Sequence, residues 1–235
     1  MGGYRERPGA VPGVTVWSRT DGGGDPYRVL PDGCMDLIWH DGTLLVAGPD
    51  TAAYVATARP GSTFAGLRFA PGTAPALLGA PAAEVRDRRV LLADLWPAAR
   101  ARRLAERADA GPVAALEAWA VARTAEAAPA DPLPAAITAA LAAGRSVAGV
   151  AAACGLEERQ LRRRCETAFG YGPRTLGRVL RLQRALALAR AGVPFARVAA
   201  DTGYADQPHL AREVRALAGV PLGELIRLPP AAPAG

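Results

Sequence analysis

Lysine is absent from this sequence, so all 28 basic residues are arginine. Cysteine is scarce: Cys34, Cys154 and Cys165 are an odd number without a C-x-x-C pair. The spacing excludes a disulfide framework and the common cysteine-based zinc sites, and it indicates reduced thiols packed as small apolar side chains. An alternative stays open, in which Cys34 is a redox or electrophile sensor.

Long hydrophobic runs are missing as well. Half of the 235 residues are hydrophobic, but Gly, Pro or Arg interrupts each apolar run before the roughly 18 residues that a membrane helix needs. The N-terminus lacks the basic, apolar and small-residue succession of a secretory signal. The sequence therefore predicts a cytoplasmic protein without a membrane partner, long enough for two domains that each bury a core.

The net charge of +6 lies in the C-terminal half. Residues 131–235 contain 14 arginines and 8 acidic residues, whereas residues 1–130 contain 14 of each. Positive charge confined to one half of a chain indicates a polyanion partner for that half and a different task for the other.

The segment AAPADPLP, 127–134, is a Pro/Ala-rich break. We expect it to separate a domain over 1–128 from one over 129–228. Upstream, β-rich runs separated by Gly/Pro turns predict a mainly antiparallel, barrel-like sheet in an α+β fold. Its strands are expected at 14–19, 27–30, 35–40, 43–48, 52–57 and 63–69.

Helices are expected to close this first domain. Short helical turns follow Pro71, and two longer helices span residues 98–127. Four apolar residues recur there at helical spacing: Leu104, Val113, Leu116 and Trp119. Core packing is the first interpretation of these residues, and a homodimer face is the alternative. The first dozen residues and the tail 229–235 are predicted to be disordered.

Downstream of Pro134 the sequence predicts an all-α domain. Gly and Pro mark the junctions between the expected helices. These helices are predicted at 134–143, 146–153, 158–169, 173–191, 194–201, 207–218 and 221–227.

The basic half contains an internal repeat. VAGVAAACGL (147–156) aligns with FARVAADTGY (195–204) at an offset of 48. Each copy has a short Ala-rich helix, a glycine turn and a longer helix, which is the pattern of a helix-turn-helix. With one extra residue in the second turn, three further pairs align: Leu161 with Leu210, Arg163 with Arg212 and Gly170 with Gly219.

One face of each longer helix is apolar, and the other is rich in arginine and polar residues. The residues expected to face inward are Leu161, Cys165 and Ala168 in the first copy, and Leu210, Val214 and Leu217 in the second. An outward arginine face is often only solvated, but two such faces in a tandem repeat on a basic half-chain favour nucleic-acid binding.

The segment between the copies, 173–191, is expected to form a linker helix of about 28 Å. This is close to the roughly 34 Å between successive major-groove faces on one side of a duplex, so one chain can place two recognition helices in adjacent grooves. Arginines on and near the linker helix are expected to meet phosphates. They are Arg174, Arg178, Arg181 and Arg184, with Arg197 in the second copy.

The segment from Ser146 to Arg227 resembles the DNA-binding domain of the AraC/XylS transcription regulators. The resemblance rests on VAGVAAACGL, on RQLRRRCETAFGYGPRTLGRVLRLQRALALA and above all on VAADTGYADQPHLAREVRALAGVPLGELIR. It implies a sequence-specific transcription regulator with helix-turn-helix units at about 146–169 and 194–218, bound to double-stranded promoter or operator DNA. RNA polymerase and a second copy of the chain are further partners that it suggests.

The resemblance also implies which residues read bases. They are Arg159, Arg162 and Arg163 in the first unit, and Gln207, His209 and Arg212 in the second. Arg suits guanine and Gln suits adenine, because each can form two hydrogen bonds to its base. Glu157 and Glu158 depart from the usual Ser-like cap; they suit the helix dipole but would repel phosphates.

The N-terminal half resembles, more weakly, the sensor domains attached to some members of this family. The resemblance rests on LPDGCMDLIWHDGTLLVAGPDT and the 37 residues from Pro60 to Trp96, and it implies control by a small-molecule effector. Aromatic residues and one strand arginine are the candidates for binding it: Trp39, Tyr54, Phe64 and Arg68.

Arg68 has two possible environments. Strand alternation places its side chain opposite Leu67 and Phe69. If those two pack under the closing helices, Arg68 is expected to face solvent. In the reversed register it would enter the barrel and hold an anion.

Two other function classes stay open: a non-specific architectural DNA-binding protein, and an enzyme domain fused to a DNA-binding domain. Asp36, His40 and Asp41 would need further ligands to hold a metal. The three scattered cysteines lack the reactive context and zinc cluster of a DNA-repair methyltransferase. We therefore expect no metal, no cofactor and no catalytic residue.

Overall fold

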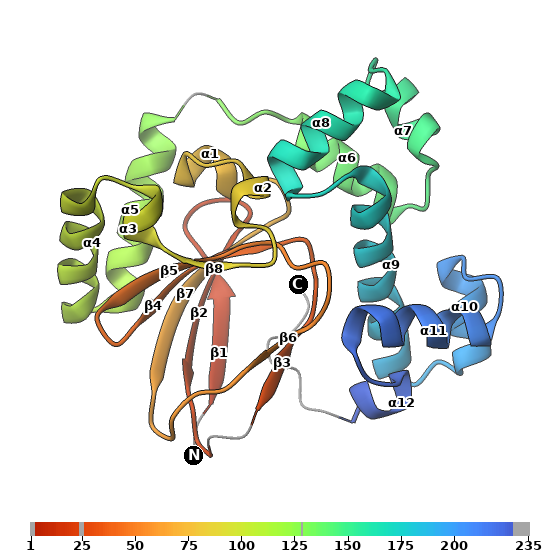
Figure 1. Ribbon diagram of the computed structural model, residues 1–235, viewed down its shortest axis with the longest axis horizontal. Coiled ribbons are helices and arrows are strands. Elements are labelled where there is room, and N and C mark those ends of the chain that lie inside the picture. The colour runs from red at the N-terminus through yellow and green to blue at the C-terminus, as the bar shows by residue number, and fades with distance from the viewer. Residues whose placement is uncertain (1–2, 24–25, 128, 228–235) are drawn as a thin grey trace.

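A computed structural model describes residues 3–23, 26–127 and 129–227. Its strands are β1 (Tyr4–Pro8), β2 (Val14–Thr20), β3 (Tyr27–Val29), β4 (Met35–His40), β5 (Thr43–Ala47), β6 (Tyr54–Ala56), β7 (Thr63–Phe69) and β8 (Arg89–Leu91). Six of them form an antiparallel sheet in the order β1-β2-β7-β4-β5-β8, and β3 pairs with β6 alone (Figure 1).

The structure confirms the α+β class and the six predicted strands. The six-stranded sheet is barrel-like but not closed, because its ends at β1 and β8 do not join. Two expectations need correction. The prediction that the first dozen residues are disordered is wrong, because β1 pairs with β2 from Tyr4 to Pro8. The short strand β8 interrupts a stretch in which only helical turns were expected.

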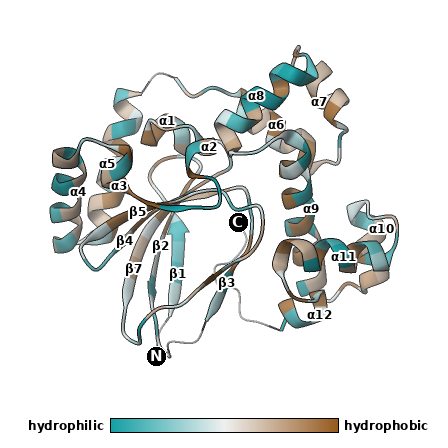
Figure 2. Ribbon diagram, viewed as in Figure 1, coloured by the Kyte–Doolittle hydropathy of each residue, from teal (hydrophilic) through white to brown (hydrophobic). Residues whose placement is uncertain are grey.

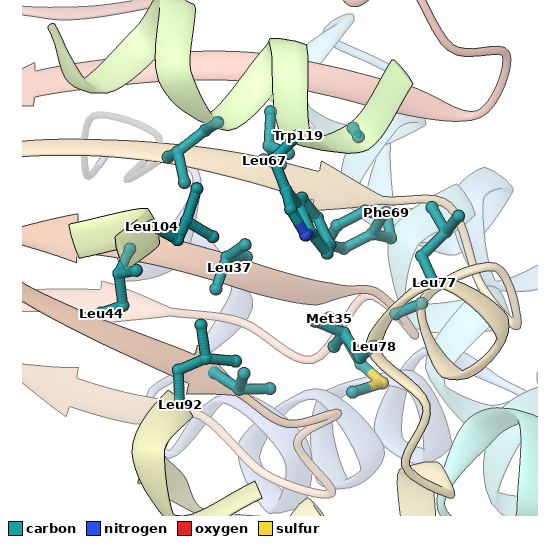
Figure 3. Close-up of a cluster of buried hydrophobic side chains, with 14 of the residues drawn as sticks. Met35, Leu37, Leu44, Leu67, Phe69, Leu77, Leu78, Leu92, Leu104 and Trp119 are labelled. Atoms are coloured by element: carbon teal, nitrogen blue, oxygen red, sulfur yellow. The ribbon is translucent and has the colours of Figure 1, made fainter. Parts of the chain in front are cut away.

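Helices cover one face of the large sheet. They are α1 (Ala74–Leu78), α2 (Ala82–Val85), α3 (Leu92–Leu95), α4 (Ala98–Ala110) and α5 (Pro112–Glu126). Alternation in β7 turns Leu67 and Phe69 towards α5, where the Phe69 ring meets the edge of Trp119 at 6.4 Å between centroids (Figure 3). Leu104 and Leu116 are buried in the same cluster, which confirms core packing for these two helices.

Every regular element described after residue 132 is a helix. The helices are α6 (Leu133–Ala142), α7 (Val147–Ala153), α8 (Glu158–Phe169), α9 (Pro173–Arg190), α10 (Phe195–Thr202), α11 (Gln207–Ala218) and α12 (Leu222–Leu225). All seven predicted helices are present, and their ends lie within two residues of the expected positions. Helical periodicity and Gly/Pro punctuation therefore predicted this half well.

The linker helix α9 belongs to two hydrophobic cores. Leu176 and Val179 pack in the core of the first helix-turn-helix, and Leu182 and Leu186 pack in the core of the second. In the described part of the chain, no helix combines the length and the apolar character that crossing a membrane requires. The predicted disordered tail, 229–235, lies outside the described residues.

Gly48, directly after β5, is a position where only glycine fits. A Cβ atom at this residue would overlap the carbonyl oxygen of Val85 at the end of α2. We expect Gly48→Ala to lower the free energy of unfolding by about 3 kcal/mol or more, because backbone atoms have to move. Denaturant unfolding measures this. Gly3→Ala, whose added Cβ meets nothing within 4 Å, is the control, and equal midpoints for the two variants would contradict the expectation.

Candidate nucleic-acid interface and sensor cavity

The second helix-turn-helix consists of α10, a glycine turn and α11. Gly203 ends α10 with a φ of 77°, the left-handed conformation that the turn requires. Asp206 caps α11, since its Oδ1 accepts a hydrogen bond from the backbone N–H of His209 at 2.6 Å. The inward-facing residues are buried as predicted: Leu210, Val214 and Leu217.

The outer face of α11 carries the predicted reading residues. Gln207 and Arg212 are exposed, and His209 is half-buried. Nδ1 of His209 accepts a hydrogen bond from the backbone N–H of Ala205 at 3.2 Å, and the ring meets Tyr204 edge-on. Nδ1 as the acceptor assigns the proton of the neutral ring to Nε2. The imidazole is thus fixed against the turn, with Nε2–H as its donor.

The first helix-turn-helix consists of α7 and α8. Ser146 caps α7 through a hydrogen bond from the backbone N–H of Gly149 to its Oγ, at 3.1 Å. At the start of α8, the side-chain Oε1 of Gln160 accepts from the backbone N–H of Glu157 at 3.0 Å, which is one half of a capping box. Leu161 and Cys165 are buried as predicted, whereas Ala168 is half-buried.

The outer face of α8 is strongly hydrophilic (Figure 2). Arg159, Arg162 and Arg163 are all exposed on it. Arg162 forms an ion pair with Glu166 at 2.9 Å, so it has to exchange this partner before it can contact DNA. Such exposed pairs are worth at most about 1 kcal/mol, and a phosphate or base can replace the carboxylate.

Several arginines near the linker helix connect helices to one another. Nε of Arg178 on α9 lies 2.8 Å from Glu213 on α11. The guanidinium of Arg184 donates to the carbonyl oxygens of Ala142 at 2.9 Å and Asp201 at 3.2 Å. These contacts hold α9 to both neighbouring units and make Arg184 a structural residue.

The remaining predicted phosphate contacts have different surroundings. Arg197 pairs with Asp201 one turn along α10, at 2.8 Å. The guanidinium of Arg181 lies over the ring of Tyr204, 5.4 Å from its centroid. Arg174 is exposed at the start of α9, and among the described residues its side chain forms no ion pair. Of the arginines predicted to contact phosphates, Arg174 therefore has the charge that is most available to an anion.

A cavity of about 530 Å³ lies on the face of the large sheet opposite α4 and α5. We call it the sensor cavity. Strands of the large sheet form one wall, the β3–β6 pair forms another, and the C-terminal helices contribute Gln183, Arg190, Glu224 and Leu225. It is thus bounded by both halves of the chain.

The structure brings three of the four predicted effector residues together in this cavity. Tyr54, Phe64 and Arg68 line it. Trp39 lies on the other face of β4, and its indole N–H donates to Asp109 Oδ1 at 2.8 Å. The alternation of β4 places Asp36 in the cavity instead.

Arg68 follows the register in which Leu67 and Phe69 pack under the helices. The expectation that it then faces solvent is wrong: its side chain is only 14% exposed. The reason is that both faces of the sheet are covered, one by α4 and α5 and the other by the β3–β6 pair and the C-terminal helices (Figure 1).

Buried charges lie at the floor of the sensor cavity. Nε of Arg68 lies 3.6 Å from Asp36 and 3.8 Å from Asp32. Burial opposes the charge of Arg68, but the two carboxylates outweigh it and raise its pKa. Burial raises the pKa of Asp36 to about 6, against the opposing effects of Arg68 and of the Trp17 indole N–H at 2.7 Å. The floor thus holds a carboxyl group whose pKa is raised to about 6.

Cys34 also lines the cavity. Burial and the neighbouring Asp32 raise the pKa of its thiol well above the usual value. Because the thiolate is the reactive form of cysteine, this favours the packed-thiol interpretation over a sensor thiol. Within the described ranges, no three His, Cys, Asp or Glu side chains form a group that could hold a metal ion.

Two arginines of the cavity were missed by sequence reasoning. The guanidinium of Arg19 lies 3.4 Å from the centroid of the Tyr27 ring, and that of Arg89 lies 4.1 Å from the centroid of the Tyr54 ring. Arg89 also pairs with Asp50. These contacts hold the β3–β6 pair against the large sheet, and no local sequence pattern marks them because their partners lie in other strands.

Comparison with known proteins agrees with this arrangement. Residues 137–227 match the family model of a helix-turn-helix domain. The chain carries an AraC-type DNA-binding domain. In front of the AraC-type domain, residues 14–91 match a domain of unknown function, DUF6597. No curated protein sequence matches the chain.

Solved structures show the same fold. ToxT from Vibrio cholerae O395 has a TM-score of 0.51 and 10% identity, over 94% of this chain and 99% of ToxT. An apo form of a ToxT variant from Vibrio cholerae strain SCE256 has the same TM-score and coverage at 11% identity. An N-terminal antiparallel sheet followed by a helical C-terminal domain is therefore a known architecture.

Asp36 should make stability depend on pH. Its pKa is raised from 3.8 to about 6, so between about pH 4 and pH 6 the folded protein holds a proton that the unfolded chain releases. The corresponding stabilisation, on the order of 2–3 kcal/mol, is complete below pH 4 and is lost as the pH rises through 6. Asp36→Asn stays neutral throughout this range.

The variant should therefore melt at a higher temperature than the wild-type protein at pH 7.5, and at a similar temperature at pH 4. Thermal denaturation of both proteins across this range measures the effect. A difference in melting temperature that stays constant with pH would contradict it.

Proposed function

We propose that this AraC-type regulator reads a specific DNA site with both recognition helices, and that a small molecule in the sensor cavity controls this binding. The observation that carries the proposal is the position of the cavity, whose wall includes Gln183 and Arg190 of α9. The same helix packs in the cores of both helix-turn-helix units. A ligand at that wall therefore contacts the element that spaces the two recognition helices.

We assign base reading in the second unit to Gln207, His209 and Arg212. The first two stand in the first turn of α11, and Arg212 follows on its outer face. In the first unit we assign it to Arg159 and Arg163, with Arg162 after exchange of its carboxylate partner. At these positions an arginine can form two hydrogen bonds to the major-groove edge of guanine, and a glutamine can form two to that of adenine.

Phosphate contacts are assigned to Arg174, and to Arg178, Arg181 and Arg197 where a phosphate replaces or joins their present partners. The 18 residues of α9 span about 27 Å, so the two recognition helices are spaced for adjacent major grooves.

RNA polymerase and a second copy of the chain, which the resemblance suggests as partners, belong to this proposal. It requires no metal, cofactor or catalytic group.

The effector's chemistry follows from the cavity lining. Tyr27, Tyr54 and Phe64 offer aromatic surfaces, and Asp36 and Arg68 offer charged hydrogen-bonding groups at the floor. An apolar or aromatic small molecule with one polar end fits this combination.

Loss of a reading side chain tests the DNA assignment. Gln207→Ala or Arg212→Ala should cost about 1–3 kcal/mol at the cognate site and little on other DNA. The site is first enriched from random duplexes with the full chain, and footprinting at raised salt then compares the variants. Arg174→Ala is the control; it should weaken binding to all sequences alike and reduce the salt slope by about one.

Two results would overturn the assignment. Unchanged affinity of both reading variants for the enriched site would show that these residues do not read bases. A wild-type chain that binds DNA but enriches and protects no defined site would instead be an architectural DNA-binding protein.

Blocking the cavity tests the effector site. Val55 of β6 lines the cavity and is 47% exposed, whereas Val121 of α5 is 45% exposed on the far side of the sheet. Compounds that raise the melting temperature of the full chain in a library screen should also stabilise Val121→Trp but not Val55→Trp. Those compounds should also change DNA affinity. Equal stabilisation of both variants would place the binding site elsewhere.

A further inference from the structure

The two glycines that end the recognition helices occupy equivalent positions in the repeat. Gly170 ends α8 with a φ of 78°, and Gly219 ends α11 with a φ of 75°. Gly170 is buried and Gly219 is exposed, and residues of the N-terminal half lie against both of them. A Cβ atom at Gly170 would lie 2.7 Å from Pro49, and one at Gly219 would lie 3.1 Å from Nη1 of Arg28. The sensor half therefore contacts the C-terminal ends of both recognition helices.

The contact with the first recognition helix comes from α2 and the residue after it. Nη1 of Arg86 donates to the carbonyl oxygen of Gly170 at 3.1 Å, and α2 packs against α8. A positive side chain at a helix C-terminus is stabilised by the partial negative charge of the last carbonyl groups. Arg86 does not line the sensor cavity.

The contact with the second recognition helix comes from the β3–β6 pair and the loop before β6. The backbone N–H of Ala53 donates to the carbonyl oxygen of Leu217 at 2.7 Å. Arg28 of β3 reaches Gly219, and within the described residues it forms no ion pair. Its guanidinium thus lies at the C-terminus of α11, as that of Arg86 lies at the C-terminus of α8. Nearby, the Gln183 side chain donates to the carbonyl oxygen of Pro31 at 2.6 Å.

The β3–β6 pair depends on its surroundings for its position. It has three residue pairs, and among the described residues neither of its strands is paired with a strand of the large sheet. Two-stranded ribbons are marginally stable alone. Tyr27 and Tyr54 of this pair line the sensor cavity beneath Arg19 and Arg89. A ligand that displaces either tyrosine displaces the strands that hold the end of α11.

We propose that Arg86 and Arg28 are positioning residues that fix the first and the second recognition helix respectively, and that the cavity acts on the second helix alone. This inference rests on the proposed function, because it assigns regulation to the α11 half of the DNA site. The α8 half is held by a contact outside the cavity and keeps its affinity when the cavity is filled.

Hydrogen exchange without DNA tests the positioning directly. Arg28→Ala should speed amide exchange about three- to tenfold in the last turn of α11, because the cation at that terminus is lost, and leave the end of α8 unchanged. Arg86→Ala should do the reverse. Arg28→Lys should restore most of the protection, since it keeps the charge. Arg59→Ala, an exposed residue in the loop before β7, is the control.

Equal acceleration at both helix ends in either variant, or none in both, would overturn the positioning roles. This result does not depend on DNA, so it stays separate from a failure of sequence-specific binding.

Half-site variants of the enriched DNA test the regulatory asymmetry. Gln207→Ala and Arg163→Ala first identify which half each helix reads. Arg28→Ala should then weaken binding to the intact site about three- to tenfold, and should have no effect once the α11 half is scrambled. Arg86→Ala should show the converse dependence on the α8 half. Arg28→Ala that weakens both half-sites equally would overturn the asymmetry.

Discussion

The arrangement of the two helix-turn-helix units depends on the apolar side of the linker helix α9. Leu176 and Val179 of α9 complete the first helix-turn-helix core, and Leu182 and Leu186 complete the second. Because the helix is continuous, it sets the distance between the two helix-turn-helix units. The opposite side of α9 is then available to the sensor half, and Gln183 uses it to bind the segment after β3. One element thus serves as spacer, shared core and cavity wall.

The positive charge of the C-terminal half has more than one use. Arg178 and Arg184 connect helices, and Arg162 and Arg197 are paired with carboxylates one turn away. Only part of the arginine charge of this half is therefore available to an anion without a competing protein partner. A net charge alone predicts a polyanion ligand correctly but overstates how many arginines are available to hold it.

Local periodicity predicted the helices of the DNA-binding half and the buried faces of α8 and α11. The same approach missed β1, whose residues YRERP are polar and mostly exposed, so that backbone pairing holds the strand rather than an apolar face. It also misjudged Arg68, because that side of the sheet is covered by the separate β3–β6 pair and by helices more than a hundred positions later. The local sequence pattern of a strand does not show which distant elements cover its two faces.

In the candidate site, too, some residues could be predicted from the sequence and others could not. The residues proposed to read bases could be chosen because they occupy repeated positions on helices. The cavity, by contrast, combines single residues from many strands and from α9 and α12. Contacts such as Ala53 with Leu217 use backbone atoms only, so no side-chain type could have revealed them. Such features require the fold itself.

The docking of the sensor half on both helix ends bears on how such regulators diversify. The donors at the Gly170 and Leu217 carbonyl groups belong to Arg86 and Ala53, in the half that recombination would exchange. A chimaera that joins a foreign N-terminal half to this DNA-binding half keeps every residue proposed to read bases, yet it loses the donors to the carbonyl groups at the ends of the two helices. Modular exchange between regulators of this architecture is therefore constrained less by the linker than by two small matching surfaces.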